Sequence, residues 1–254
     1  MAKPVVPLVQ PERWRDLYRF VAIVLGLILL RSCIADWHHV PSNSMFPTIH
    51  GGDRVLVNRL AFGLHMPLTN QFIVRWNQPK RGDIVTFHLA SDPTLLIKRV
   101  AAVPGDLVFM RSGWLVINGE PATYRGVDEG KVPGFEPARH QHLVMIEERI
   151  LNQTRFIARF HRSEPVASQN LEEEFQREST KDLAKDFGPL TVPTDHYLVL
   201  GDHRDDSVDY RSFGLVHRQY IQDRAYAVAI SLRPDTYTLQ FKRSMLQLQP
   251  SPRL

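Results

Sequence analysis

A short apolar segment near the N-terminus limits how this chain can fold more than any other feature. Residues 20–30 read FVAIVLGLILL, without one polar side chain, although a membrane-spanning helix needs about 20 such residues. Trp14 and Trp37 suit the two membrane interfaces, and an arginine at each end, Arg19 among them, can reach lipid head groups. A helix from Trp14 to Trp37 would be roughly 36 Å long. We therefore expect one transmembrane helix, at residues 17–37.

Two other interpretations of this segment stay open. It has the layout of a cleaved secretory signal, in which Cys33, Ile34 and Ala35 form a small-x-small site before Asp36. A lipoprotein signal that ends at Cys33 is the third interpretation, although Arg31 lies where such a signal has a small or apolar residue. We favour the uncleaved anchor.

The orientation of the anchor follows from the charges before it. Lysine or arginine occupies positions 3, 13, 15 and 19. Positive residues stay on the cytoplasmic side of a membrane, so residues 1–16 are predicted to be cytoplasmic and the chain after Trp37 extracytoplasmic. The prediction is a single-pass protein of the inner (plasma) membrane, in contact with membrane lipid.

The remaining composition is that of an ordinary globular protein, with 43% hydrophobic and 23% charged residues. The formal net charge of +4 is too small to indicate a nucleic-acid partner. The single cysteine excludes an intrachain disulfide framework and a multi-thiolate metal site. No metal or organic cofactor is expected, and nothing in the sequence implies oligomerisation.

Beyond Trp37 the chain is predicted to be mostly β. Alternating apolar residues, with turn signals such as Asn118-Gly119, indicate short strands joined by tight turns. The predicted strands are 53–57, 83–87, 108–110, 115–117, 143–147, 155–160, 197–200 and 225–232. Residues 125–190 are more charged and include a helix-like stretch at 171–185, which indicates an insertion or second subdomain. It divides a core made of residues 38–124 and 191–254.

Two serines in a rigid stretch are the first candidates for chemistry. Residues 41–48 read PSNSMFPT and place Ser42 and Ser44 between two prolines. The prolines keep the stretch non-helical, so it can hold a hydroxyl group in one position. Taken alone, a plain linker next to the membrane is the simpler interpretation.

A lysine inside an apolar strand is the second candidate. Lys98 interrupts the apolar run at residues 95–100. Burial lowers the pKa of an ammonium group, by up to about 3–5 units, and a neutral amine can take the proton from a serine hydroxyl that needs a base. The simpler alternative is an edge lysine that discourages strand pairing.

A polar loop is the third candidate. Residues 201–214 read GDHRDDSVDYRSFG and follow the apolar strand at 197–200. Such a loop is well placed to orient a catalytic group through side-chain hydrogen bonds, but it could also be an ordinary solvated loop. A calcium-binding loop does not fit, because the oxygen ligands lack the usual spacing.

Together these segments resemble the motifs of the type I signal peptidase family, membrane-anchored Ser–Lys endopeptidases. Residues 41–48 match Pro-Ser-x-Ser-Met-x-Pro-Thr, residues 81–85 match Arg-Gly-Asp-Ile-Val, residues 97–106 match the lysine motif, and residues 201–211 match Gly-Asp-x-Arg-Asp-x-Ser-x-Asp-x-Arg. The resemblance implies an antiparallel coiled-sheet or barrel-like catalytic core. It also implies removal of N-terminal signal peptides from exported preproteins at the outer face of the membrane.

The resemblance assigns the catalytic roles residue by residue. Ser44 would be the nucleophile that forms an acyl-enzyme, and Lys98 the general base. The Ser42 hydroxyl and the Ser44 N–H would form the oxyanion hole. Ser207 would hydrogen-bond to Lys98 and position it.

The supporting and substrate-binding residues are implied in the same way. Asp209 and Arg211 would form a supporting ion pair. The substrate would bind as an extended strand beside residues 36–41 and 95–98. The matched positions expected to contact it are Val40, Pro41, Met45, Ile49, Leu96 and Ile97.

The chain also departs from the family pattern. Asn43 stands where a small residue is usual, His203 and Asp206 each replace an asparagine, and Phe213 replaces a tryptophan. His203 raises a rival mechanism, a Ser–His pair supported by Asp202. Two alternative functions also stay open: a specialised peptidase of a pilus or conjugation system, and a catalytically inactive, membrane-anchored assembly protein.

Overall fold

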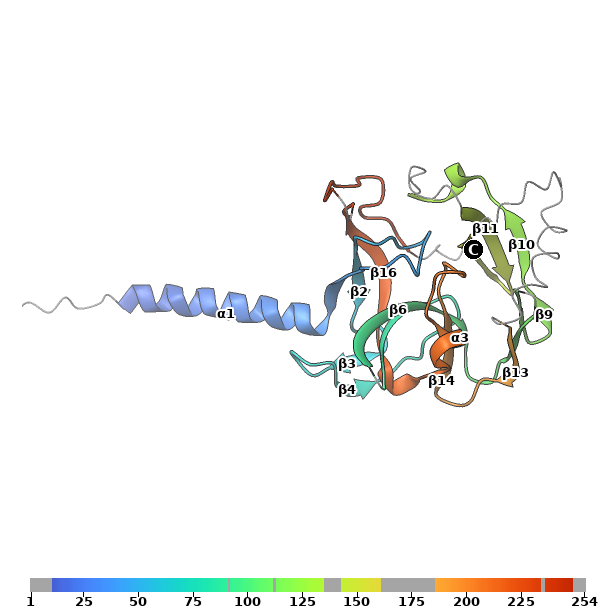
Figure 1. Ribbon diagram of the computed structural model, residues 1–254. Coiled ribbons are helices and arrows are strands. Elements are labelled where there is room, and N and C mark those ends of the chain that lie inside the picture. Colours follow the sequence, from blue (N-terminus) through green and yellow to red (C-terminus); the bar gives the residue numbers. More distant parts are fainter. Residues whose placement is uncertain are drawn as a thin grey trace, which may run out of the picture.

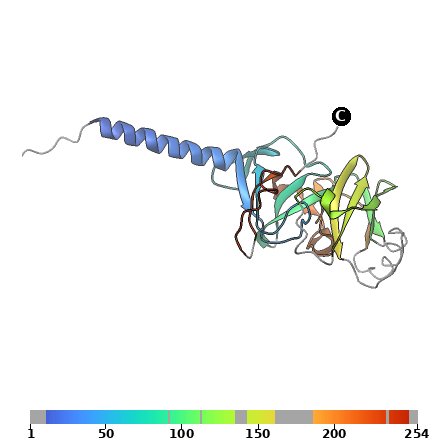
Figure 2. The ribbon, with the colours of Figure 1, turned by 90° about the horizontal axis from the view of Figure 1, so that it is seen from above.

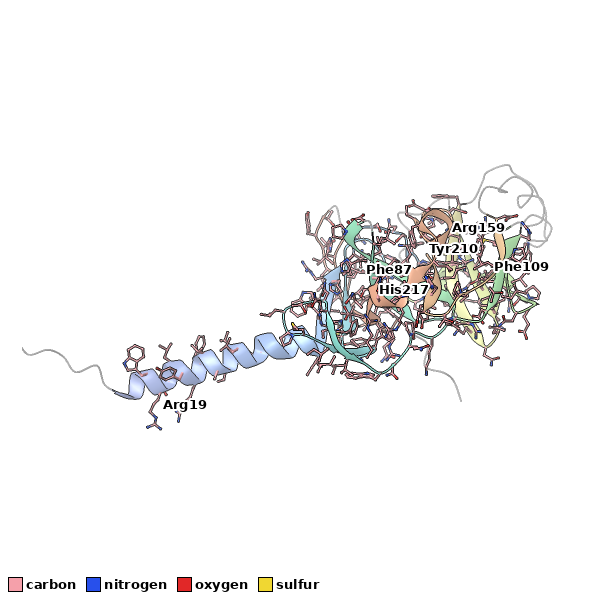
Figure 3. The ribbon with its side chains drawn as sticks, turned by 90° about the horizontal axis from the view of Figure 1, so that it is seen from below. Arg19, Phe87, Phe109, Arg159, Tyr210 and His217 are labelled. Atoms are coloured by element: carbon pink, nitrogen blue, oxygen red, sulfur yellow. The ribbon has the colours of Figure 1, made fainter. Side chains whose placement is uncertain are left out.

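The computed structural model describes residues 11–90, 92–111, 113–134, 143–160, 186–233 and 236–248. One long helix, α1 (Pro11–Cys33), extends away from a body built of strands (Figure 1, Figure 2). Figure 3 shows Arg19 on the part of α1 that lies clear of this body. Within the described residues, no helix combines the length and the apolar character that crossing a membrane requires.

The helix ends earlier than the sequence indicates. After Cys33 the chain changes direction, and strand β1 begins at Ala35. Trp37 pairs with Leu56 of the neighbouring strand, so the last residues of the predicted segment 17–37 belong to the sheet. Pairing with a partner strand satisfies their backbone groups, which is a tertiary effect that the local pattern does not contain.

The strands in chain order are β1 (Ala35–His39), β2 (Asp53–Asn58), β3 (Gly63–His65), β4 (Phe72–Arg75), β5 (Ile84–Leu89), β6 (Asp92–Ala102), β7 (Leu107–Arg111), β8 (Trp114–Ile117), β9 (Glu120–Pro121), β10 (Thr123–Gly126), β11 (Leu143–Ile150), β12 (Gln153–Phe160), β13 (Phe187–Thr191), β14 (His196–Leu200), β15 (Val216–His217) and β16 (Ile221–Ser231). Short helical turns are η1 (Glu129–Lys131), α3 (Tyr210–Phe213) and η4 (Arg218–Tyr220). The expected mostly β fold is therefore confirmed.

The main sheet has seven strands in the order β1-β2-β16-β5-β6-β14-β15, and each adjacent pair is antiparallel. Strand β6 is long and curved (Figure 1). Its first half pairs with β5, and β14 joins its other edge only from Arg99 onward. Residues 92–98 thus lie on a stretch of β6 that has a neighbour on one side.

Three smaller sheets complete the body: β10-β11-β12, β13-β7-β8-β9 and the β3-β4 hairpin. The predicted Asn118-Gly119 turn joins β8 and β9, and both residues have positive φ, at 54° and 83°, as a tight hairpin turn requires. Strands β11 and β12 lie within the part of the chain interpreted as an insertion, residues 125–190, and β10 begins two residues before it. The predicted helix at 171–185 falls outside the described residues.

Apolar side chains from the main sheet and the loop after β1 form one of the buried clusters. Val55 and Val57 alternate inward along β2, as half-buried strands do. They pack with Met45 and Ile49 of the loop. This packing fixes the loop that carries the two candidate serines against the sheet.

Candidate active site

Ser44 lies in the loop between β1 and β2, and hydrogen bonds hold this loop in shape. The Val40 N–H donates to the Asp53 carbonyl at 2.9 Å, where the loop meets the strands. Within the loop, the Gly51 N–H donates to Asn43 Oδ1 at 2.8 Å. The asparagine that departs from the family pattern therefore supplies an internal bond to the serine loop.

Lys98 reaches the same point from β6, where it lies opposite Val85 of β5. Its Nζ lies 2.8 Å from Ser44 Oγ and 3.0 Å from the carbonyl oxygen of Ile97. Only 3% of the Lys98 surface is exposed. The fold thus brings together two residues that lie 54 positions apart in the sequence.

The environment of Lys98 favours its neutral form. Burial lowers the pKa of Lys98 from 10.5 to about 8, because an ammonium loses its hydration when water is removed. The carboxylates of Asp209 and Asp202 act in the opposite direction and raise this pKa. A neutral amine in hydrogen-bond contact with a hydroxyl can accept its proton.

Two hydrogen-bond donors lie next to the Ser44 hydroxyl. Ser42 Oγ donates to Ser44 Oγ over 3.4 Å, and Ser42 is exposed. Among the described residues, no hydrogen bond uses the Ser44 N–H. Both groups predicted for the oxyanion hole can therefore donate to the carbonyl oxygen of a bound substrate. The only described hydrogen bond lost is the 3.4 Å bond from Ser42 Oγ.

Asp209 and Arg211 form an ion pair beneath the site, at the start of α3. Arg211 Nε and Nη2 donate to Asp209 Oδ1 and Oδ2 at 2.8 and 2.7 Å. Asp209 Oδ2 also accepts the Gly201 N–H at 2.9 Å. Burial alone would raise the pKa of Asp209, but these hydrogen bonds outweigh it and hold the pKa below its usual value.

Ser207 differs from the expectation. Lys98 donates to Ser44 and to a backbone carbonyl, and the buried Ser207 Oγ makes no hydrogen bond within the described part of the chain. Ser207 packs instead against Gly201, so closely that a side chain at position 201 would overlap Ser207. The hydrogen bond between Ser207 and Lys98 that the resemblance implies is absent from these described contacts.

The need for a glycine at position 201 was not predicted from the sequence. A Cβ at this position would lie 2.1 Å from Ser207 Oγ and 2.5 Å from the carbonyl oxygen of Ser44. The glycine therefore lets the end of β14 approach the serine loop. Its place directly after an apolar strand was the available signal, because glycine there often marks close backbone approach.

Of the six residues expected to contact substrate, three are buried, two are half-buried and one is exposed. Val40, Met45 and Ile49 are buried together in one core cluster, with the half-buried Ile97 against it. Leu96 packs against a different cluster. Pro41 is exposed.

The rival Ser–His mechanism finds no supporting geometry. The His203 ring lies between Phe46 and Phe160, with ring centroids 6.1 and 5.1 Å away. Its backbone N–H, rather than its ring, contacts Ser44, by donating to the Ser44 carbonyl at 3.2 Å. The carboxylate that would support the histidine is committed elsewhere, because Asp202 is bound by Arg99.

Arg99 and Thr48 are two further residues whose roles the sequence did not reveal. Arg99 Nε and Nη2 donate to Asp202 at 2.8 and 2.6 Å, and Thr48 Oγ1 donates to the same carboxylate at 2.6 Å. These bonds tie β6 and the serine loop to the segment after β14.

Within the described residues, no group of three or more His, Cys, Asp or Glu side chains is arranged to hold a metal ion.

Comparison with known proteins agrees with this geometry. A family model described as signal peptidase, peptidase S26, matches residues 13–230. A signal peptidase I from Pseudomonas fluorescens is 30% identical over 224 residues, which cover 84% of this chain and 70% of the relative. Its counterpart from Pseudomonas aeruginosa is 29% identical with the same coverage. A signal peptidase I from Aquifex aeolicus is 26% identical, over 85% of this chain and 84% of the relative.

The family match extends over most of the chain. It includes the serine loop with Ser44, strand β6 with Lys98, and residues 201–211. The chain is a serine endopeptidase of the kind that removes signal peptides. It belongs to the signal peptidase family, peptidase S26.

Proposed function

We propose that Ser44 is the nucleophile of this peptidase and Lys98 its general base. The observation that carries the proposal is the 2.8 Å contact between Lys98 Nζ and Ser44 Oγ. Ser44 Oγ attacks the carbonyl carbon of the scissile bond, and its proton passes to Lys98 Nζ. Lys98 then gives this proton to the leaving amine, and the new N-terminus departs from an acyl-enzyme.

The second half of the reaction uses the same groups. Lys98, neutral again, takes a proton from a water molecule that attacks the acyl carbon. The bond between this carbon and Ser44 Oγ then breaks, Lys98 returns the proton to Ser44 Oγ, and the cleaved signal peptide leaves with a free carboxylate. The Ser44 N–H and the Ser42 hydroxyl stabilise the negative oxygen in both steps. A single donor of this kind typically contributes about 10²–10³ in rate.

The substrate lies as an extended strand at open edges of the main sheet. β1 is the last strand on one side of that sheet, and residues 92–98 of β6 have a described partner strand only in β5. Backbone pairing along such an edge holds a peptide whatever its sequence. Leu96 and Ile97 come directly before Lys98 on this stretch, and Pro41 follows β1, so these residues contact the substrate near the cut.

The chain is held in the inner (plasma) membrane by the helical part of the predicted segment 17–37, which ends at Cys33, with residues 1–16 in the cytoplasm. The basic residues before the apolar run support this orientation. A second apolar surface supports lipid contact: the β3-β4 hairpin lies beside the body end of α1 (Figure 1) and carries exposed large apolar side chains. These are Met66, Leu68, Ile73, Val74 and Trp76.

The products are therefore mature exported proteins, released at the outer face of the membrane. Residues 38–124 and 191–254 form the catalytic part, and residues 125–190 form a second subdomain. A specialised peptidase of a pilus or conjugation system would share the same site. Cleavage of a panel of unrelated preproteins distinguishes it, because such an enzyme would cut one class of substrate only.

Cleavage of a preprotein by the detergent-solubilised chain tests the mechanism. Ser44→Ala and Lys98→Ala are expected to reduce kcat/KM by about 10³-fold or more, while His203→Ala retains most activity. Equal thermal unfolding temperatures would show that the variants are folded. Full activity of either of the first two variants would disprove the Ser–Lys mechanism, and loss in His203→Ala together with Ser44→Ala would favour the Ser–His pair.

A further inference from the structure

A cavity lies behind the serine loop, separate from the contact between Ser44 and Lys98. Its volume is about 180 Å³, and a cavity of about 150 Å³ is large enough to bind benzene. Pro47 and Thr48, which belong to the serine loop, form one wall. The rest of the lining comes from β12, from the segment 246–248, from Val132 and Pro133, and from Arg99 of β6, and six of the eleven lining residues are apolar.

Arg155 of β12 is the most unusual residue of this lining. Its side chain is only 5% exposed. Its Nε donates to Glu148, but within the described residues its Nη2 atom, which is buried, has no hydrogen-bond partner. A buried guanidinium N–H without an acceptor loses the hydration that it has in the unfolded chain.

The charges around Arg155 do not balance. Three buried cations, Arg99, Arg155 and Arg204, face two buried anions, Asp202 and Glu148. The two arginines that bind the glutamate share a single oxygen, Oε2. They hold the pKa of Glu148 at about 2 despite its burial, so this carboxylate is already fully ionised at neutral pH.

Among the described residues, one positive charge next to the cavity is therefore left without a buried counter-charge. Burial is the main cause that lowers the pKa of Arg155, and the nearby Arg204 and Arg99 lower it further. An unbalanced buried charge is unfavourable, and an anion placed in the cavity would remove the imbalance. Apolar neighbours such as Val132 and Phe156 would exclude water from an alkyl group.

We propose that this cavity binds a small organic monoanion, a carboxylate that carries a short alkyl chain. The carboxylate lies against the guanidinium group of Arg155, whose charge it balances, and the alkyl chain lies against the apolar lining. The occupant also touches Pro47 and Thr48, close behind the nucleophile. The site is independent of the proposed peptidase mechanism, because neither Ser44 nor Lys98 lines the cavity.

Binding is measured on the full chain in a non-ionic detergent, by fluorine NMR of trifluoropentanoate. The wild-type chain is expected to give a saturable change in the fluorine signal, which pentanoate reverses. Pentanol, which has the same chain without the charge, and inorganic phosphate, which has the charge without the chain, are expected to compete poorly. Absence of saturable binding to the wild-type chain would overturn the proposal.

Two variants locate the site. Arg155→Met leaves two cations and two anions in the cluster, so we expect it to fold and to bind at least about tenfold more weakly. Val132→Phe fills the cavity without changing its charge and is also expected to weaken binding. Both should unfold at a temperature close to that of the wild type.

Arg159→Met is the matched control, because Arg159 is an arginine of the same strand that pairs with Asp205 (3.4 Å) and does not line the cavity. Figure 3 shows Arg159 in the half of the body that lies farther from α1. This variant is expected to bind like the wild type. Unchanged affinity in Arg155→Met would overturn the assignment of the carboxylate, and equal competition by pentanol or by phosphate would overturn the proposed ligand class.

Discussion

Gly201 and Ser207 are packed so closely that not even a methyl group fits between them. A Cβ on Gly201 would lie 2.1 Å from Ser207 Oγ and 2.5 Å from the carbonyl oxygen of Ser44. A residue larger than glycine therefore does not fit at position 201 without movement of its neighbours. Gly201, directly after β14, also lies against the carbonyl oxygen of Ser44 in the loop that carries the nucleophile. A larger residue there would push this loop away and change the distance between Ser44 and Lys98.

Gly201→Ala is expected to lower kcat/KM at least about tenfold, because misplacing a reacting group by a fraction of an ångström weakens catalysis strongly. Preprotein cleavage measures the effect, and Gly130→Ala is the control. A Cβ on Gly130 would have only one neighbour within 4 Å, Asp128 Oδ1 at 3.9 Å. Equal activity of the two variants would show that the site tolerates movement at Gly201.

The pH dependence of cleavage should follow Lys98. Its pKa of about 8 lies below the ordinary 10.5, so the neutral, active form increases as the pH rises through 8. Asp209 raises this pKa; Asp209→Asn is therefore expected to move the rise in kcat/KM to lower pH. Asp128→Asn, at an exposed position, should leave the profile unchanged. A profile that does not move in Asp209→Asn would mean that another group titrates.

Asn43→Ala removes the acceptor for the Gly51 N–H. We expect a loss of about 1 kcal/mol in the free energy of unfolding, as for a typical hydrogen bond, together with lower kcat, because the serine loop becomes looser. Asn43→Asp keeps an oxygen at the position and should retain most of both. Urea unfolding and cleavage assays provide the two measurements, and an unaffected Asn43→Ala would show that the bond is not needed.

Glu148→Gln is expected to destabilise the fold by about 3–5 kcal/mol, because it removes the counter-charge of two buried arginines. The control Glu147→Gln affects a pair with the exposed Arg149, in which Glu147 itself is half-buried, and should cost less than about 1 kcal/mol. Since the pKa of Glu148 falls from 4.5 to about 2 on folding, its contribution is complete above pH 4.5 and is lost as the pH falls toward 2. Urea unfolding at several pH values tests both statements.

Local pattern predicted most strands, because alternation along the chain reports which side chains face the core. Strand β2 and the Asn118-Gly119 turn formed as expected. The predicted end of the helix at residue 37 was wrong, because α1 ends at Cys33. The aromatic side chain of Trp37 suits a membrane interface and a sheet edge equally well. Its partner Leu56 decides between them.

The candidate site was only partly predictable for a similar reason. Ser44 and Lys98 carry recognisable motifs, but Glu148 and Arg155 look like polar residues on the solvated face of a hairpin. Only the strand register, which places them opposite each other, and the packing above them turn them into a buried pair. Burial of a charged pair arises from tertiary packing and leaves no mark on the local sequence.

The joint between α1 and the sheet has a mechanical consequence. A single residue, Ile34, separates the helix from β1, and its carbonyl already accepts the Arg59 N–H at 3.0 Å. No flexible linker therefore joins α1 to β1, and a rotation of α1 is transmitted directly to β1. Under the proposed membrane anchoring of α1, a thinner or thicker bilayer would change the tilt of the helix and would turn the edge strand proposed to bind the substrate.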